Sequence, residues 1–404
     1  MEKFNVRDIP RRRFLELSAK GGLLIAATPA LLSQLTSCAG SPGGTSGFNM
    51  DKATLGKVIA KALEKGGDFA EVYLENRISR EIVMEESKFK SGLYGISQGA
   101  GVRVISGNKT GYAYTDEITY EKLMRAAEVA SYVAKNGNKF TPVNITAAVR
   151  KSFVTVQKPL GEVADERRIE IIKRADQAAK GYDPRIRMAI INYNDEIRGR
   201  VIANSEGLYL KNELPLLFFI VQVMSSEGNA RHMARERLSL HSGFEMFDLV
   251  TPEKVATNAA REAIAMLAAQ DAPAGIMDVV MQNGWGGVLV HEAVGHPLEA
   301  DNIAKGIGTF TGKIGQKVAN ECFTMIDDGT IPNARGTINF DDEGTQAQRN
   351  VLIEKGVLKG FMTDILSAKQ LSMPRTGNGR RESFRHIPIP RMTNTFIDLS
   401  LIHI

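Results

Sequence analysis

Apolar and polar positions recur with two spacings along the chain, and together they predict an α+β protein. Helical spacing, with apolar residues three and four apart, marks the segments 51–65, 120–134, 163–180 and 252–269. Strand-like alternation marks 69–76, 79–85, 101–105, 110–115, 186–192, 198–203, 207–213, 216–226 and 277–282. Short turn signals such as Ser106-Gly107-Asn108 separate neighbouring strands. We therefore expect antiparallel sheets flanked by helices.

Breaks in this pattern divide the chain into several domains. At 404 residues it is long enough for two or three, each with its own core. We expect an N-terminal α+β domain at 51–140, a middle domain at 160–270 and a C-terminal domain at 272–397. The proline-bounded stretch 142–159 reads as the linker between the first two.

The first fifty residues have the order of parts found in exported lipoproteins. Arg11-Arg12-Arg13-Phe14-Leu15 resembles a twin-arginine export signal, and the apolar stretch 21–35 that follows is too short and too interrupted to span a membrane. Leu35-Thr36-Ser37-Cys38 resembles a lipobox. We expect a signal peptide at 1–37, lipidation at Cys38, a flexible tether at 38–50 and a membrane-anchored lipoprotein on the periplasmic side. A basic start followed by a buried first helix is the alternative.

The charge balance gives no reason to expect nucleic-acid binding. The net charge is +5, but residues 1–37 hold six Lys or Arg and three Asp or Glu, so the rest carries +2 with no basic run. Cys38 and Cys322 are the only cysteines of the sequence. If Cys38 is lipidated, no disulfide can form.

A histidine pair with a glutamate beside it is the strongest chemical signal. His291 and His296 are five residues apart, and Glu292 follows the first. Neutral imidazoles are preferred zinc ligands, and a glutamate at this place is the usual general base of zinc peptidases. On an ideal helix the two rings would point roughly 140° apart. A π-bulge would bring them onto one face, and Gly295 and Pro297 favour a distorted helix there. The alternative is a pair of ordinary surface or core histidines.

Further residues around this pair are candidates for the site. Glu299 or Asp301 could orient a ligand ring through a hydrogen bond. The block 375–395 could form a wall that holds a substrate backbone or carboxylate, or it could be a surface turn. Its substrate-binding candidates are Arg380, Arg381, Arg391 and Asn394.

Other conspicuous side chains have ordinary interpretations. His232 and His241 are interpreted as surface or structural residues, since no acidic residue is placed like a ligand partner. The acidic groups at 327–328 and 341–343 lack the alternate spacing of a calcium loop and are interpreted as turns.

The motif His-Glu-Ala-x-Gly-His-x-x-Glu-x-Asp at 291–301 resembles that of the TldD/PmbA family, metallopeptidases once called modulators of DNA gyrase. The segments 101–105, 110–116, 204–207, 377–383 and 388–395 are similar to other parts of the family, in the same order. The resemblance runs from about 51 to about 397. It implies a TldD-like zinc metallopeptidase acting on extended or unfolded peptides, as a homo-oligomer or with a TldE-like partner subunit.

The resemblance also implies a third zinc ligand, a cysteine close to the C-terminus, which this chain lacks. Cys322 lies too early to match and is expected to be a buried free cysteine. Residues 398–404 read as an artefactual tail, because 399–404 resembles a translated sequencing adapter. We therefore expect an incomplete C-terminal domain with weak metal binding and little activity. The alternative function is a non-catalytic exported subunit or peptide-binding partner of a TldD/TldE-like complex.

Overall fold

A computed structural model describes residues 48, 50–134, 144–284 and 286–398. The predicted signal peptide, Cys38 and nearly all of the tail lie outside these residues. Phe48, within the predicted tether, is described and is buried in the first hydrophobic core. No helix in the described part of the chain is long and apolar enough to span a membrane.

A single seven-stranded sheet runs through both of the first two expected domains. Its strand order is β3-β2-β1-β5-β6-β4, with β7 also paired to β6. Every pairing is antiparallel except that of β4 with β6. The strands are β1 (Phe69–Glu85), β2 (Lys88–Ser106), β3 (Lys109–Thr115), β4 (Thr146–Ala147), β5 (Ile186–Asn204), β6 (Leu208–Glu227) and β7 (Ala230–Leu240).

Four of these strands are much longer than the pattern predicts, and β2, expected only at 101–105, already begins at Lys88. β1, β5 and β6 each run through what reads as two separate strands, because the long neighbours supply backbone hydrogen bonds throughout. The prediction missed β7, whose Arg231, Arg235 and Arg237 hide the alternation. The expected strand at 277–282 is wrong. That segment pairs with no other described strand, and Ile276 just before it and Val280 within it are fully exposed.

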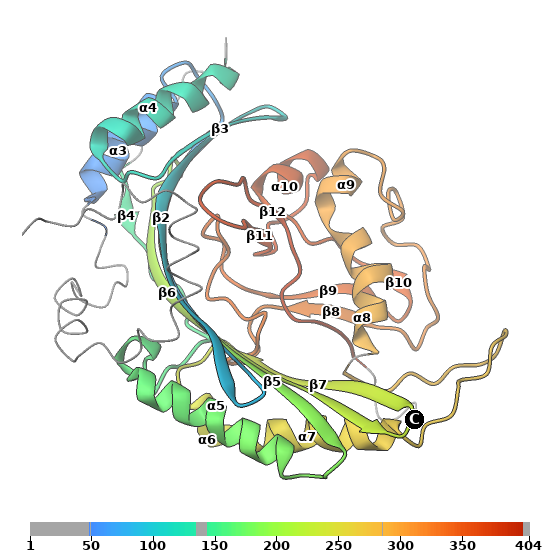
Figure 1. The fold of residues 1–404 in the computed structure, drawn as a ribbon. Helices are drawn as coiled ribbons and strands as arrows, with labels where there is room; N and C mark the ends of the chain where they lie inside the picture. The colour runs from blue at the N-terminus through green and yellow to red at the C-terminus, as the bar shows by residue number, and fades with distance from the viewer. Residues whose placement is uncertain (1–47, 49, 135–143, 285, 399–404) are drawn as a thin grey trace, which may run out of the picture. The chain divides into compact units, whose positions relative to one another are not determined.

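Helices cover one face of the large sheet. α3 (Lys52–Ala62) and α4 (Tyr120–Ser131) pack at one end, and α5 (Asp165–Lys180) and α7 (Pro252–Met266) pack at the other (Figure 1). Asp51 caps α3 by accepting a hydrogen bond from the backbone N–H of Thr54, as predicted. The alternation of β1 sends Val72 and Leu74 to this helical face.

The opposite face of the sheet carries polar residues at its centre. Glu71, Tyr73 and Glu75 alternate with the apolar positions of β1 and are fully buried. Glu71 and Tyr73 contact Arg381 and Asp342 of the C-terminal part of the chain, and Glu75 binds Arg198 of the same sheet. The expected α+β fold with helix-flanked antiparallel sheets is confirmed, and its main sheet has two differently covered faces.

The C-terminal part is built around a second, four-stranded sheet of order β10-β9-β8-β13. These strands are β8 (Met325–Asp328), β9 (Arg349–Glu354), β10 (Val357–Leu358) and β13 (Thr395–Ile397). β11 (Gly379–Arg380) and β12 (Ile389–Pro390) form a separate hairpin. Short helices complete it: α8 (Gly287–Val290), α9 (Ala300–Ala304) and α10 (Ile365–Leu371). Its core takes in Leu298, next to the histidine pair, and Met392, which follows β12.

Candidate metal site

The histidine pair lies where the helix changes its winding. After α8 the chain makes a π-helical turn at His291–Gly295 and then a 3₁₀ turn at His296–Leu298. The backbone N–H of His296 donates to the carbonyl of His291, which is the i+5 bond of a π-helix. The π-bulge predicted from the five-residue spacing is therefore confirmed. Gly295 leaves room for Met392, since a Cβ atom at this position would lie too close to the Met392 sulfur and would displace that side chain.

This winding brings the three motif side chains together. The ring centroids of His291 and His296 are 4.7 Å apart, with the ring planes at 83°. Possible ligand atoms of His291, Glu292 and His296 all lie within 4.8 Å of one another. Glu292 Oε2 is 3.8 Å from His296 Nε2. Among the described residues this is the one group of three such side chains that could hold a metal ion.

A buried carboxylate fixes the ring of His296. Glu299 is 3% exposed, and its Oε2 lies 3.1 Å from His296 Nδ1 and 2.5 Å from Arg391 Nη1. A proton on Nδ1 would donate to this carboxylate and leave the Nε2 lone pair free for a metal. Asp301, the other acid predicted for this role, lies 3.8 Å from Lys305 Nζ instead.

The two histidines are suitable zinc ligands, but they form an incomplete set. Two imidazoles, one of them oriented by a carboxylate, are typical zinc ligands. Catalytic zinc sites use three protein ligands, and the described residues bring no third histidine or cysteine into the cluster. Cys322 lies outside it. The expectation that this cysteine is buried is wrong, because it is exposed in a turn.

A cavity of about 610 Å³ opens between the histidine pair and the β11–β12 hairpin, and we call it the metal-site pocket. Its lining residues are His291, His296, Glu299, Arg380, Arg381, Glu382, His386, Ile387, Ile389, Arg391 and Met392. Three of the four predicted substrate-binding residues are among them. Asn394 is not: its side chain accepts from Gly336 N and donates to the carbonyl of Asp328. Asn394 therefore links two backbone segments and does not line the pocket.

Arg381 lines this pocket but its guanidinium group is directed elsewhere. Its Nη2 is 2.5 Å from Glu71 Oε1, and its backbone N–H donates to Asp342 Oδ2 over 2.9 Å. The whole side chain is buried. The assignment of Arg381 as a residue that holds substrate is thus corrected, since its charge is already neutralised inside the protein.

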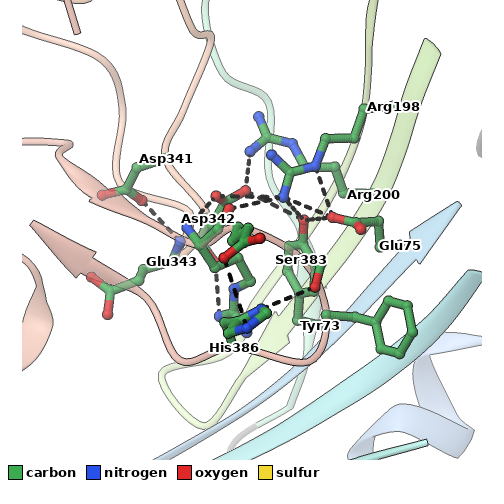
Figure 2. Close-up of polar contacts among 12 residues, drawn as sticks. Tyr73, Glu75, Arg198, Arg200, Asp341, Asp342, Glu343, Ser383 and His386 are labelled. Atoms are coloured by element: carbon green, nitrogen blue, oxygen red, sulfur yellow. Dashed lines mark hydrogen bonds and ion pairs between the residues drawn. The ribbon is translucent and has the colours of Figure 1, made fainter. Parts of the chain in front are cut away.

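The partners of Arg381 belong to a buried network that we call the ionic junction. It joins the polar face of the large sheet to the C-terminal part and consists of Glu71, Glu75, Arg103, Arg198, Arg200, Asp342, Glu343 and Arg381. Arg103 bridges Glu71 and Glu343 over 3.0 and 2.6 Å. Arg198 and Arg200 point toward Glu75 and Asp342 (Figure 2).

Burial alone would raise the pKa of the Asp342 carboxyl group, but Arg198, Arg200 and Arg381 hold that pKa below its usual range. The acidic group at 341–343 forms the turn predicted from the sequence, with the backbone N–H of Gly344 donating to the carbonyl of Asp341, and this buried turn is the centre of a domain contact. Adjacent acids in a sequence are typical of a turn on the protein surface. The burial of this turn cannot be predicted without the arginines that distant strands bring beside it. For Asp327 and Asp328 the predicted turn is wrong, since both lie buried on β8.

The large sheet also holds the loop of the β11–β12 hairpin. Arg77 Nη2 donates to the carbonyl of Glu382 over 2.8 Å, and Tyr112 Oη donates to that of Phe384 over 2.5 Å. Phe384 is buried against Gly99, where any Cβ atom would overlap its ring. His386, which the sequence reasoning missed, lies in this loop with Nδ1 3.1 Å from Ser383 Oγ (Figure 2). The sheet therefore positions one wall of the metal-site pocket.

Comparison with protein families is decisive at this point. Models of the first, central and C-terminal domains of PmbA/TldA metallopeptidases match residues 70–134, 158–267 and 274–401. The chain belongs to the PmbA/TldA metallopeptidase family. A metalloprotease TldD homolog of Haemophilus influenzae is 36% identical over 360 residues, which is 86% of this chain and 74% of the relative. A metalloprotease of Methanocaldococcus jannaschii is 30% identical over 346 residues, 84% of this chain and 75% of that one.

Solved structures agree with this PmbA/TldA fold. TldE from Thermococcus kodakarensis superposes with a TM-score of 0.68 at 19% identity, over 85% of this chain and 77% of that one. A Thermotoga maritima protein described as a modulator of a DNA gyrase gives 0.71 at 20% identity, with the same coverage. At such identities the structures establish the shared fold alone.

Proposed function

We propose that this chain is a zinc-dependent metallopeptidase that cleaves extended or unfolded peptides, with Glu292 as its general base. The observation that carries the proposal is the cluster made by the π-helical turn, in which Glu292 Oε2 lies 3.8 Å from His296 Nε2. A carboxylate at this distance from a ligand nitrogen is within reach of a water molecule in the same site. A zinc metalloprotease TldD homolog of Saccharolobus solfataricus, 28% identical over 344 residues, supports the choice of metal.

Each residue of the site has a distinct part. His291 and His296 would hold the zinc ion, and Glu299 keeps the His296 ring in place. Bound zinc supplies Lewis-acid chemistry, because it polarises a carbonyl group and makes water easier to deprotonate. Glu292 takes the proton from the attacking water and then returns it to the leaving amine. The partly exposed side chains of Glu292 and His296 leave the cluster accessible to a peptide from the metal-site pocket.

The alternative is a non-catalytic subunit or peptide-binding partner of a TldD/TldE-like complex. It is favoured by the incomplete ligand set, since the described residues bring two imidazoles to the cluster and no third histidine or cysteine. Retention of Glu292 favours the peptidase, because a structural zinc site has no use for a base.

Location and assembly complete the proposal. We propose that the segment 11–38 directs export by the twin-arginine route and that Cys38 carries the lipid anchor. The protein would act on the periplasmic side, as a homo-oligomer or with a TldE-like partner. The likeness of its fold to Thermococcus kodakarensis TldE is consistent with a partner of similar fold.

Zinc titration of the metal-free full chain, followed by peptide cleavage, tests the proposal. For a version that carries the expected C-terminal cysteine ligand we expect about one zinc ion per chain, cleavage of an unfolded peptide only in the zinc-loaded form, and loss of cleavage with a chelator. The 404-residue chain should bind zinc weakly and cleave little. His296→Ala should abolish zinc binding, whereas His232→Ala, on β7, should leave it unchanged. A chain that binds zinc at full stoichiometry but cleaves no peptide would support the non-catalytic alternative.

A further inference from the structure

Neighbouring arginines of the metal-site pocket differ in how their charges are compensated. Arg381 is paired with Glu71, and Arg391 with Glu299. Arg380 has no ion-pair partner: within the described residues, no carboxylate oxygen lies within 4.0 Å of its guanidinium nitrogens. Its one side-chain hydrogen bond runs from Nη1 to the carbonyl of Met392, over 2.8 Å. Its remaining N–H groups have no acceptor in the described structure.

This lack of a partner is costly at the place where Arg380 lies. The residue is partly buried on β11, opposite Ile389 of β12. Burial lowers the pKa of its guanidinium group. A charged group taken out of water is normally retained only with a partner or a function, because its desolvation has to be offset. Arg380 therefore has an unused binding capacity for an anion.

The surroundings define which anion it would take. The same pocket holds His291 and His296, and its walls include the apolar side chains of Ile387, Ile389 and Met392. Glu382 does not compensate Arg380, since its side chain is 82% exposed and faces His386 at 3.8 Å. An anion that enters with an apolar chain beside it matches this lining. A guanidinium fork fits a carboxylate with two parallel hydrogen bonds.

We propose that Arg380 binds a carboxylate group of the peptide substrate, close to the bond that is cleaved. This proposal rests on the proposed peptidase function, since it names the substrate class for the same pocket. The carboxylate has two sources: the free C-terminus of the peptide, or an Asp or Glu side chain near the scissile bond. The first makes the enzyme remove residues from C-terminal ends, and the second makes it select acidic sites within a chain.

Peptide binding to the metal-free full chain tests this without relying on activity. Four fluorescent peptides that differ only in their carboxylates would be compared by anisotropy. They are a free acid with one Glu, its C-terminal amide, its Glu→Gln version, and the form with both changes. We expect one of the two single neutralisations to weaken binding about 10-fold to 100-fold, the range of a charge-assisted hydrogen bond. The neutralisation that does so identifies the source of the carboxylate.

Variants of the hairpin assign the effect to Arg380. Arg380→Gln should weaken binding of the preferred peptide to the level of its neutral version and abolish the discrimination. Arg380→Lys, which keeps the charge, should restore part of it. The matched control is Arg385→Gln in the same hairpin, because Arg385 pairs with Asp116 and does not line the pocket.

The proposal is overturned if no peptide binds, if neither neutralisation changes the affinity, or if Arg380→Gln still discriminates. Cleavage by the zinc-loaded protein is measured separately. A chain that shows Arg380-dependent discrimination but no cleavage would contradict the peptidase function while leaving carboxylate binding in place. Cleavage without discrimination would support the peptidase function and contradict carboxylate binding by Arg380.

Discussion

Arg380 and Arg381 are adjacent in sequence and belong to two regions built on opposite principles. Arg381 points into the ionic junction, where its side chain is fully buried and paired with Glu71. Arg380 lines the metal-site pocket, where it has no ion pair with any described residue. Arg380 is the last residue of β11 and Arg381 follows it, so the alternation of side chains along an extended chain accounts for their opposite directions. One charge serves the assembly of the fold, and its neighbour remains available to a ligand.

The comparison shows how polar residues divide between stability and function. In the ionic junction, charges from β1, β2 and β5 meet those of residues 342, 343 and 381, so that removing one member leaves others unpaired in a dry interior. In the metal-site pocket the histidines and Glu292 are partly open to solvent, and their removal leaves little buried charge behind. We therefore expect large stability effects in the first region and large functional effects in the second.

The largest expected stability effect comes from Arg381→Gln. It removes the closer of the two arginine partners of Glu71, which keeps Arg103 at 3.0 Å, and should lower the free energy of unfolding towards the lower end of the about 3–5 kcal/mol of broken buried ion pairs. Urea unfolding measures this. The control is Arg375→Gln, which removes a partly exposed pair with Glu206 and should cost less than about 1 kcal/mol. Equal costs for the two variants would contradict the distinction between the regions.

The second effect concerns the contact between sheet and hairpin. Gly99→Ala places a Cβ atom in the volume of the buried Phe384 ring, so we expect a cost at the upper end of the roughly 1–3 kcal/mol typical of overpacking. Because Phe384 anchors the loop that carries His386, peptide cleavage should fall as well. Gly92→Ala on the same strand meets no atom within 4 Å and should change neither property. Full activity in Gly99→Ala would show that the sheet does not position the pocket wall.

A smaller effect depends on pH and involves His241, which lies outside both regions. This histidine is buried with Nδ1 2.6 Å from the carbonyl of Pro215, and burial lowers its pKa to about 4. The unfolded chain, with a pKa near 6.5, takes up the proton first, so stability is lost as pH falls from about 6.5 towards 4. At pH 5 the loss is about 2 kcal/mol.

The unfolding free energies of wild type and His241→Asn at pH 7.5 and pH 5 isolate this contribution. The variant lacks this contribution. Its free energy of unfolding should therefore fall by about 2 kcal/mol less than that of wild type between pH 7.5 and pH 5. An identical pH dependence in the two proteins would show that His241 is not held neutral by burial.

Features set by local geometry could be predicted from the sequence. The five-residue spacing of His291 and His296 requires a π-helical turn if both rings are to share one face, and that turn is present. The cap at Asp51 likewise depends on a few neighbouring residues. The alternation in β1, β5 and β6 indicated antiparallel strands, although it did not reveal their full length.

Features that depend on distant residues could not be predicted. Asp342 reads as part of an acidic turn, and only the fold brings Arg198 and Arg200 of β5 to it, more than 100 residues away in sequence. For the same reason Arg380 and Arg381 looked equivalent, since the sequence does not say which of two adjacent side chains faces the junction. The continuous sheet through the first two expected domains is also a product of long-range pairing, between β1 and β5.

Glu292→Gln tests the central claim most directly. Glu292 is exposed and lies outside the ionic junction, so the substitution should change the free energy of unfolding by no more than about 0.5 kcal/mol. Zinc stoichiometry should equal that of wild type, while cleavage of an unfolded peptide should fall by about 10²–10⁴-fold, the usual contribution of a general base. A variant that binds zinc normally and cleaves at the wild-type rate would contradict the account, because Glu292 would then not be the base.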